Sequence, residues 1–389
     1  MKRLFTIFTL FLITLTLSSQ SAYKFNVIKE NKITPIKNQS STGTCWSFSG
    51  VGMLESELIR MGKGEFDLSE MYIVRRNYED KARKYVRLHG HINFAGGGSF
   101  ADVVETISDF GIIPEEAYPG LSYGSETHDH GEMDKVLKGY MDGVIAAKSL
   151  SPVWFDGFAG ILDSYLGKVP ETFNYKGKEY TAQSFASFLG LNQNDYISLT
   201  SFTHHPFYKP FAIEVPDNWR WAYSYNLPVE EMMEVMENAI MNGYTIAWAS
   251  DVSETGFSRD GIAVVPDVNS TDNAGSDQAR WTGLSARERD FDLRSRVGRE
   301  MLAEKAVTQE MRQLSFDNYQ TTDDHGMQIY GIAEDQKGNR YYMVKNSWGE
   351  TGVYNGLWYA SEPFVKYKTI SIVLHKDAIP ATILTKLGL

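Results

Sequence analysis

The sequence contains one cysteine, Cys45, inside the stretch NQSSTGTCWSFSG at residues 38–50. A cysteine acts as a nucleophile in its thiolate form, and an ordinary thiol, with a pKa of about 8.5, is only slightly ionised at neutral pH. A lone cysteine is more often a small buried apolar residue. Here the flanking Gly, Thr, Ser and Gln are typical of turns and caps, and an export leader precedes them, so an idle thiol would be open to oxidation. We therefore interpret Cys45 as a reactive thiol at the start of a helix, where the helix dipole and a neighbouring imidazolium favour the anion.

Such a thiol needs a base, and the sequence offers eight histidines. His325 differs from the others because it opens one arm of an expected β-hairpin, whose other arm ends at Asn346. The turn folds these two positions close together, so a side-chain contact is available. An amide oxygen on one ring nitrogen would fix the tautomer and direction of the imidazole. The remaining histidines lie in polar or loop-like contexts or close a strand: His89, His91, His128, His130, His204, His205 and His375.

Closely spaced histidines raise the alternative of a metal site. They occur as three pairs: His89 with His91, His128 with His130, and His204 with His205. The spacing of cysteines or carboxylates that a zinc site requires does not accompany them. We therefore expect no metal site, and no cofactor is implied.

The elements that position these residues follow from apolar periodicity and turn residues. In CWSFSGVGMLESELIRMGKG apolar residues recur at steps of three and four, which predicts an amphipathic helix ending near Gly62. FADVVETISDFG and LPVEEMMEVMENAIMNG predict two further helices, ending at Gly111 and Gly243. YTIAWASDV and TISIVLHKD are typical of strands, and HGMQIYGIAED, QKGN and RYYMVKN form the hairpin. Helices first and strands later indicate the α+β class.

The leader MKRLFTIFTLFLITLTLSSQSAY has a basic start, an apolar run and a small polar exit, which is the layout of a secretory signal peptide. Its apolar run is shorter than the roughly 20 residues that cross a bilayer. We expect residues 1–19 to be removed, with the cleavage position between 19 and 22, and the mature protein to be exported, periplasmic or secreted, without stable membrane association. The net charge of -11 argues against nucleic acid as a partner.

Four ordered motifs resemble the papain-like cysteine peptidases: the Gln of NQSSTGTCW, its Cys-Trp pair, the His of DHGMQIYGI and the Asn-Ser-Trp-Gly of VKNSWG. The resemblance implies a two-lobed fold with Cys45 as nucleophile and His325 as acid and base. It also implies Asn346 as the orienting partner of His325, and Gln39 as the side-chain donor of the oxyanion hole beside the backbone N–H of Cys45. Trp348 would shield the hydrogen bond between His325 and Asn346 from water.

The same resemblance implies where a substrate binds. Gly97 and Gly98 of GGGSF stand where substrate backbone would pair, with Trp46 and Trp348 as further substrate-binding residues. One departure follows His325, because Gly326 stands where the family commonly has alanine, which should loosen the strand without removing the imidazole.

Spacing separates branches of this family. His325 lies 280 residues after Cys45, whereas the ordinary papain arrangement places the histidine about 130 to 150 residues downstream. The large insertion this requires looks like the bleomycin hydrolase and aminopeptidase C branch, and the resemblance covers nearly all of the mature chain. It implies one peptidase domain over residues 20–389: a mainly helical lobe carrying the cysteine (20–133), the insertion and lobe connections (134–320), and a β lobe carrying the histidine and asparagine (321–389).

Relatives of this branch carry a C-terminal arm that lies in the cleft and helps select a free substrate amine, and they assemble as homo-hexamers. Here Leu389 comes soon after the last expected strand. The resemblance therefore implies a cysteine peptidase that acts on peptides, most like an aminopeptidase. It leaves open an endopeptidase of the same fold, a peptide-binding relative without turnover, and an acyl transferase.

Overall fold

The structure, a computed structural model, describes residues 21–267 and 285–389. The expected signal peptide, residues 1–19, lies outside the described residues. The described helices are α1 (Cys45–Arg60), α2 (Glu70–Arg87), α3 (Phe100–Phe110), α4 (Gly131–Ile145), α5 (Trp154–Leu166), α6 (Ala182–Leu189), α7 (Val229–Met241), α9 (Ala286–Arg296), α10 (Gln309–Asp317), α11 (Glu362–Lys368) and α12 (Ala381–Leu387). The described strands are β1 (Asn26–Glu30), β2 (Phe173–Tyr175), β3 (Lys178–Tyr180), β4 (Tyr196–Thr200), β5 (Pro210–Ala212), β6 (Tyr223–Asn226), β7 (Ile246–Ser250), β8 (Phe257–Ser258), β9 (Ile262–Ala263), β10 (His325–Glu334), β11 (Arg340–Lys345), β12 (Leu357–Ser361) and β13 (Thr369–His375).

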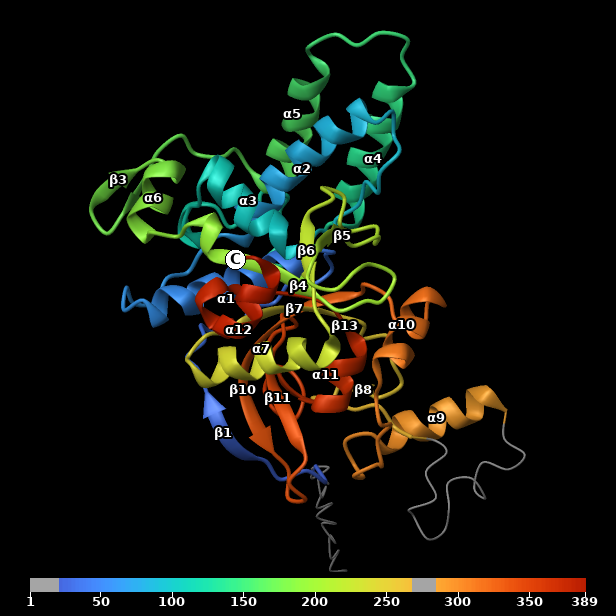
Figure 1. The fold of residues 1–389 in the computed structure, drawn as a ribbon. Helices are drawn as coiled ribbons and strands as arrows, with labels where there is room; N and C mark the ends of the chain where they lie inside the picture. The colour runs from blue at the N-terminus through green and yellow to red at the C-terminus, as the bar shows by residue number, and fades with distance from the viewer. Residues whose placement is uncertain (1–20, 268–284) are drawn as a thin grey trace, which may run out of the picture.

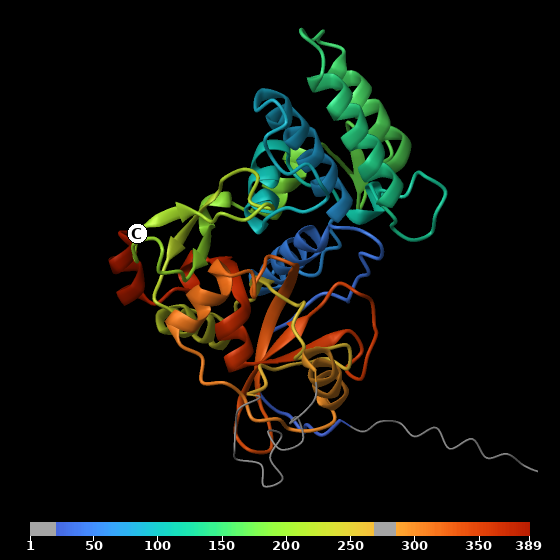
Figure 2. The same ribbon diagram turned by 90° about the vertical axis from the view of Figure 1, so that its right-hand side faces the viewer.

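The chain folds into a helical lobe and a sheet lobe, with α1 between them (Figures 1 and 2). Helices α2 to α6 pack around a core that includes Met71, Val103 and Phe158. Strands of the large sheet, with α7 and α11, enclose a second core that includes Met236 and Trp248. Each lobe therefore buries its own apolar residues, and the expected α+β class is confirmed.

The sheet lobe is built on a large mixed sheet whose strand order is β5-β6-β4-β13-β7-β10-β11-β12-β9-β8, with β1 also paired to β10. The predicted hairpin is confirmed: β10 and β11 are antiparallel, with Gln328 opposite Lys345. On its other side β10 pairs with β7, which places His325 opposite Ser250. Because Asn346 directly follows β11, the hairpin brings it back toward the start of β10.

Helix α1 is buried on nearly all sides rather than along one face. Every residue from Trp46 to Leu58 is buried, including Glu55. The predicted amphipathic stripe faces the helical lobe, and β10 covers much of the rest. Helix α1 and β10 approach each other closely at Gly326, which has no side chain. A Cβ atom there would lie 3.2 Å from the Cα atom of Trp46. Glu55 is tolerated inside because its carboxylate accepts hydrogen bonds from Thr34 and from the backbone of Leu68.

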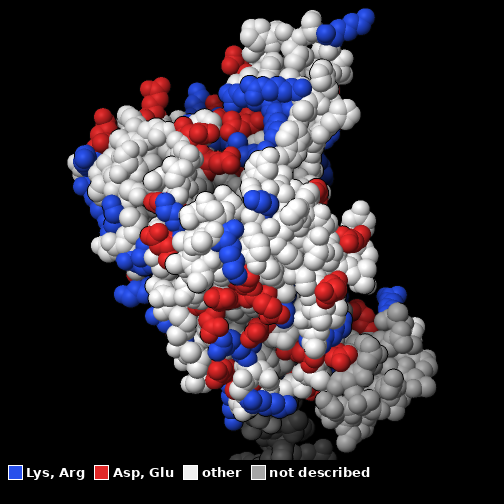
Figure 3. All heavy atoms as spheres, in the orientation of Figure 1, with Lys and Arg blue, Asp and Glu red and all other residues white. Residues whose placement is uncertain are grey.

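The middle of the chain contributes to both lobes. Helices α4, α5 and α6, within residues 131–189, join the helical lobe, while β4, β6 and β7 join the large sheet. The predicted helix α7 is confirmed and begins one residue after Pro228. Its apolar stripe lies in the second core, and its four glutamates face outward, where Figure 3 shows acidic side chains gathered.

None of the helices in residues 21–267 and 285–389 is long and apolar enough to cross a membrane. That finding concerns the described residues alone.

Candidate active site

Cys45 is the first residue of α1 and lines a pocket between the two lobes. The helix cap, Thr44, makes no side-chain hydrogen bond to the first turn. The N–H groups of Ser47 and Phe48 donate to the Thr44 carbonyl, so those of Cys45 and Trp46 are the ones at the helix start without a backbone acceptor. The backbone N–H of Gly326 also hydrogen-bonds to the Cys45 thiol. The thiol thus sits directly beside the start of β10.

His325, Asn346 and Trp348 come together from the two ends of the hairpin. The Nε2–H of His325 donates to Oδ1 of Asn346 at 2.8 Å, and both residues are buried. This bond fixes the tautomer in which Nδ1 is free to take a proton. The indole of Trp348 stacks on the imidazole, with ring centroids 4.7 Å apart. His325 lines the same pocket as Cys45.

Gln39 lies in the loop that precedes α1 and is not among the residues that line the pocket of Cys45. The hydroxyl of Ser347 donates to its Oε1 at 2.6 Å, and its Nε2 donates to the carbonyl of Thr42 at 2.7 Å. A primary amide has two N–H donors, so one remains for an oxyanion. A backbone bond from Gln39 to the Ser347 carbonyl, 2.8 Å long, ties the loop to the sheet lobe.

Burial opposes a charge on either reacting group alone. It raises the pKa of the Cys45 thiol to about 12, with a further increase from the carboxylates of Asp323 and Asp217. It lowers the pKa of His325 to about 4, against the opposing effect of the bond to Asn346. The expected effect of the helix start, which favours the thiolate, is therefore only one contribution to the pKa of Cys45. Desolvation of the thiol raises that pKa by more. The thiolate forms together with the imidazolium, as a pair, when a proton moves from Sγ to Nδ1.

Two of the four residues expected to bind substrate line the same pocket. Trp46 and Gly98 line it, and the indole N–H of Trp46 donates to the Gly96 carbonyl at 3.0 Å. Gly97 lies under the side chain of Asp217, because a methyl group on Gly97 would collide with that carboxylate. Trp348 is not among the residues of this pocket and acts on the site through its stacking on the imidazole.

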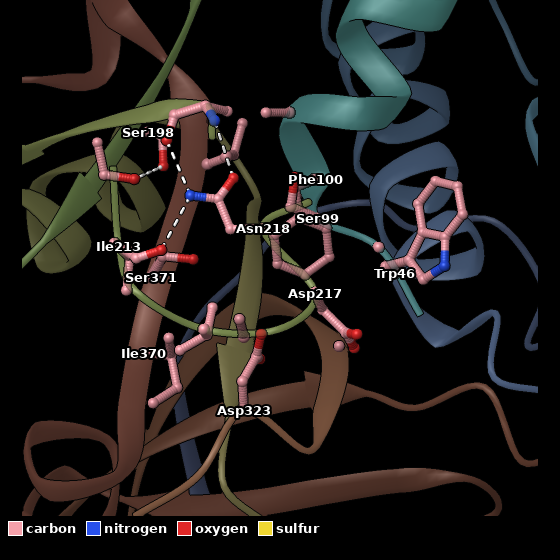
Figure 4. A pocket seen from close by; sticks show the side chains of 18 of the residues that line it. Trp46, Ser99, Phe100, Ser198, Ile213, Asp217, Asn218, Asp323, Ile370 and Ser371 are labelled. Atoms are coloured by element: carbon pink, nitrogen blue, oxygen red, sulfur yellow. Dashed lines mark hydrogen bonds between the residues drawn. The ribbon is translucent and has the colours of Figure 1, made fainter. Parts of the chain in front are cut away.

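Three carboxylates at this pocket were not predicted from the sequence: Asp217, Asp323 and Asp324. Figure 4 shows the side chains of Asp217 and Asp323 on the pocket wall, from separate segments of the chain. The signal for Asp323 and Asp324 was present, since they directly precede His325. Asp217 had none, because its loop lies 172 residues after Cys45 in sequence and reaches the site only through the fold.

Of the histidine pairs considered for a metal site, the pair His204 and His205 lies beside a carboxylate. His204 and His205 both bond to the carboxylate of Glu214, at 3.1 and 2.8 Å. In the part of the chain that the structure describes, these three residues form the one group with metal-ligand atoms close together. The Nε2 atom of each ring has Glu214 as its partner, and the Nδ1 atom of His204 hydrogen-bonds to Gln313. None of the three lines the pocket of Cys45.

Comparison with known proteins agrees with this geometry. A model of the family described as "Papain family cysteine protease" matches residues 22–145, and a model of the "Peptidase C1-like family" matches residues 274–388. The first match includes the cysteine and the second the histidine and asparagine. The crystal structure of PepW from Lactobacillus rhamnosis HN001 superposes with a TM-score of 0.70, over 93% of this chain and 84% of that one, at 17% identity. The chain belongs to the papain family of cysteine peptidases.

Within this family the chain is similar to aminopeptidase C and bleomycin hydrolase. Aminopeptidase C of Streptococcus thermophilus is 22% identical over 89% of this chain and 81% of its own length. Human bleomycin hydrolase is also 22% identical, over 95% of this chain and 86% of its own length. The large insertion between Cys45 and His325 is therefore shared with these relatives.

Proposed function

We propose that this cysteine peptidase is an aminopeptidase, which removes residues from the N-terminus of peptides. The observation that carries the proposal is the position of Asp217, whose side chain covers Gly97. In the papain arrangement this glycine is where substrate backbone on the acyl side would pair. A carboxylate there leaves little room for further residues upstream of the scissile bond. The names of the relatives, aminopeptidase C and bleomycin hydrolase, support the same activity.

The chemistry follows from the geometry of Cys45 and His325. The thiol proton moves to Nδ1 as sulfur attacks the scissile carbonyl carbon, and the carbonyl oxygen becomes an oxyanion. That charge is held by the Cys45 backbone N–H and the free N–H of the Gln39 amide. When the intermediate collapses, the C–N bond breaks and the imidazolium protonates the leaving amine, which leaves a thioester on Cys45.

The second half reaction restores the enzyme. The imidazole of His325 takes a proton from water as the water oxygen attacks the thioester carbonyl. The C–S bond then breaks, the acyl group leaves as a carboxylic acid and sulfur regains a proton from the ring. Asn346 keeps Nδ1 directed at the thiol through both halves, because its bond to Nε2 fixes the ring.

The test compares an unblocked aminoacyl amide with an N-acetylated peptide amide, in the wild type and in Cys45→Ala. We expect hydrolysis of the unblocked substrate alone, and no turnover in the variant. Turnover that survives in Cys45→Ala would refute the mechanism. Equal hydrolysis of both substrates by the wild type would refute the aminopeptidase assignment while leaving the thiol chemistry intact, and would favour an endopeptidase.

Export also stays a proposal, supported by the sequence of the leader. Cleavage after position 19 would keep Ser21 and Ala22, which have partners in the sheet lobe: Ser21 bonds to Tyr354, and Ala22 bonds to Gln336. N-terminal sequencing of the protein recovered from culture medium or periplasm would test it. An intact leader on the recovered protein would contradict the proposal. Assembly into a homo-oligomer stays a prediction, which sedimentation of the same preparation would measure.

A further inference from the structure

The pocket beside Cys45 carries an excess of negative charge. Asp217, Asp323 and Asp324 line it, and no lysine or arginine is found among the described residues of its wall. The rest of the wall is largely apolar, with Phe100, Ile213, Val215 and Ile370. Asp217 and Asp323 are half-buried, and carboxylates grouped where they are partly removed from water are costly unless a cation neutralises them. The mechanism above uses none of these carboxylates.

Asp323 is a half-buried carboxylate at the pocket wall. In the described part of the chain it accepts no hydrogen bond and forms no ion pair. Burial, with the nearby carboxylates of Asp217 and Asp324, raises its pKa to about 7. An unsatisfied carboxylate at a pocket wall is a ready acceptor for a cationic donor.

Asp217 is positioned by direct contacts. Its Oδ1 accepts a hydrogen bond from the Asn93 amide at 3.1 Å, and its Oδ2 lies against Gly97. Lys81 is nearby, but its ammonium group donates to the carbonyls of Ala95 and Gly97, at 2.7 and 2.5 Å. The lysine is therefore bound to backbone and forms no direct ion pair with Asp217. Burial raises the pKa of Asp217, and the charge of Lys81 opposes only part of this effect.

The loop that carries Asp217, residues 213–222, is held in place on both sides. The amide of Asn218 closes it with bonds to the backbone of Ile213 and Ala222. Arg220 anchors it to the helical lobe through ion pairs with Asp102 at 2.6 Å and Asp80 at 2.9 Å. The carboxylate of Asp217 is thus preorganised at the pocket rather than mobile.

We propose that Asp217 and Asp323 together bind the free α-ammonium group of the substrate, and so select peptides with an unblocked N-terminus. The proposal rests on the aminopeptidase function above and names the residues that enforce it. Both carboxylates lie close enough to Cys45 to act on its charge, and the α-nitrogen of the residue being released is only two bonds from the carbonyl carbon that sulfur attacks. An ammonium group between them gives Asp323 a partner and removes the repulsion between the two half-buried carboxylates.

Binding of the amine also assists the chemistry. The two carboxylates oppose ionisation of the Cys45 thiol. A bound ammonium group neutralises their field, so the thiolate forms more readily when the correct substrate is present. A blocked peptide brings no such charge and leaves the thiol protonated. Recognition of the amine should therefore affect kcat as well as KM.

The experiment measures kcat/KM for leucyl-coumarylamide and for N-acetyl-leucyl-coumarylamide. The ratio of the first value to the second reports the preference for a free amine. The ratio should fall by at least about tenfold in each of Asp217→Asn and Asp323→Asn, and further in the double variant, since a hydrogen bond to a charged group contributes about this much. Hydrolysis of the acetylated substrate should persist or increase. Glu214→Gln is the matched control, because it removes the same charge from the same loop, but at a side chain that faces His204 and His205. Its ratio should equal that of the wild type.

Two further probes separate this inference from its rivals. An N-acetylated substrate with arginine before the leucine tests whether the carboxylates instead bind a basic side chain; efficient cleavage by the wild type would overturn the proposal. Truncation after Leu387 removes Leu389, which lines an adjacent cavity. If that variant no longer prefers the free amine, amine selection belongs to this C-terminal segment and the proposal is also overturned.

The same measurements distinguish failure of this amine-binding subsite from failure of the proposed aminopeptidase function. A wild type without preference for the free amine refutes the aminopeptidase assignment and this subsite together. A preference that survives in the double variant refutes the subsite alone. Melting temperatures check the fold of each variant, and Asp217→Ser provides a second replacement if Asp217→Asn is unstable. Alkylation of Cys45 by leucine chloromethyl ketone, with and without N-acetylation, gives the same ratio without requiring turnover.

Discussion

The hydroxyl of Ser347 donates a hydrogen bond to Oε1 of Gln39 at 2.6 Å. This bond decides which way the Gln39 amide faces, because the oxygen is occupied and the nitrogen is turned toward Thr42 and the site. Ser347 directly follows Asn346, so the end of β11 holds both the oxyanion donor and the group that orients His325.

Removing the oxyanion donor should reduce kcat with little change in KM. For Gln39→Ala we expect a decrease of about a hundredfold or more, since one donor of an oxyanion hole contributes about that much. Ser347→Ala should lower kcat by less, about tenfold, because the Gln39 amide loses its fixed direction but keeps its N–H donors. Steady-state kinetics on the unblocked substrate measure both. An unchanged kcat in Gln39→Ala would show that this amide does not contact the oxyanion.

Loss of the amide that orients the imidazole should slow both half reactions. In Asn346→Ala the ring can turn, and we expect kcat to fall by about a hundredfold. The pKa of His325 should fall further below its ordinary range, because the bond to Asn346 raises it. NMR titration of the ring in wild type and variant measures this shift. A structural effect alone would change stability without moving the pKa.

The glycine after the histidine makes a close approach possible. A Cβ atom at Gly326 would lie 3.1 Å from two ring atoms of Phe100 and 3.2 Å from the Cα of Trp46. Gly326→Ala should therefore displace Phe100 by a few tenths of an ångström, lower the free energy of unfolding by about 1 kcal/mol and raise KM. The double variant Gly326→Ala, Phe100→Leu should recover KM. Denaturant unfolding and kinetics test this, and an unaltered KM in the single variant would contradict it.

A buried acid in the sheet lobe should make stability depend on pH. Burial raises the pKa of Glu304 to about 7, against the hydrogen bonds from Ser361 and Val265. Because this folded-state pKa lies above the value of an unfolded glutamate, about 4.3, the folded protein holds the proton more tightly. Its stabilising effect is complete below about pH 4 and is lost as the pH rises through 7.

Glu304→Gln keeps an acceptor for both donors and removes that titration. Relative to the wild type, the variant should gain about 1 kcal/mol or more in free energy of unfolding between pH 5 and pH 8. Melting curves at the two pH values measure the difference. Glu310→Gln is a control on an exposed carboxylate, which should show no such gain. If the variant and the wild type differ in free energy of unfolding by the same amount at both pH values, Glu304 is not the source of the pH dependence.

Most of the elements near the site were readable from local pattern. The helix that starts at Cys45, the hairpin from His325 to Asn346 and helix α7 all follow from periodicity and turn residues, because these features depend on neighbours in sequence. The full burial of α1 did not follow. Its polar residues, such as Glu55, look like a solvated face, and only the contact with β10 and the loop around Thr34 shows that they are enclosed.

The sequence alone determined the chemistry of this protein: a lone thiol, a histidine and an asparagine joined by a hairpin, and the motifs that place them in one family. These are properties of residue type and local order. The tertiary structure decided the surroundings of the thiol. It brought Asp217 across from a distant loop to lie on Gly97, and left Asp323 half-buried without a partner among the described residues, because long-range packing sets which charges share a pocket. The same burial reversed the expected direction of the Cys45 pKa, since desolvation depends on the whole fold and not on the residues beside the cysteine.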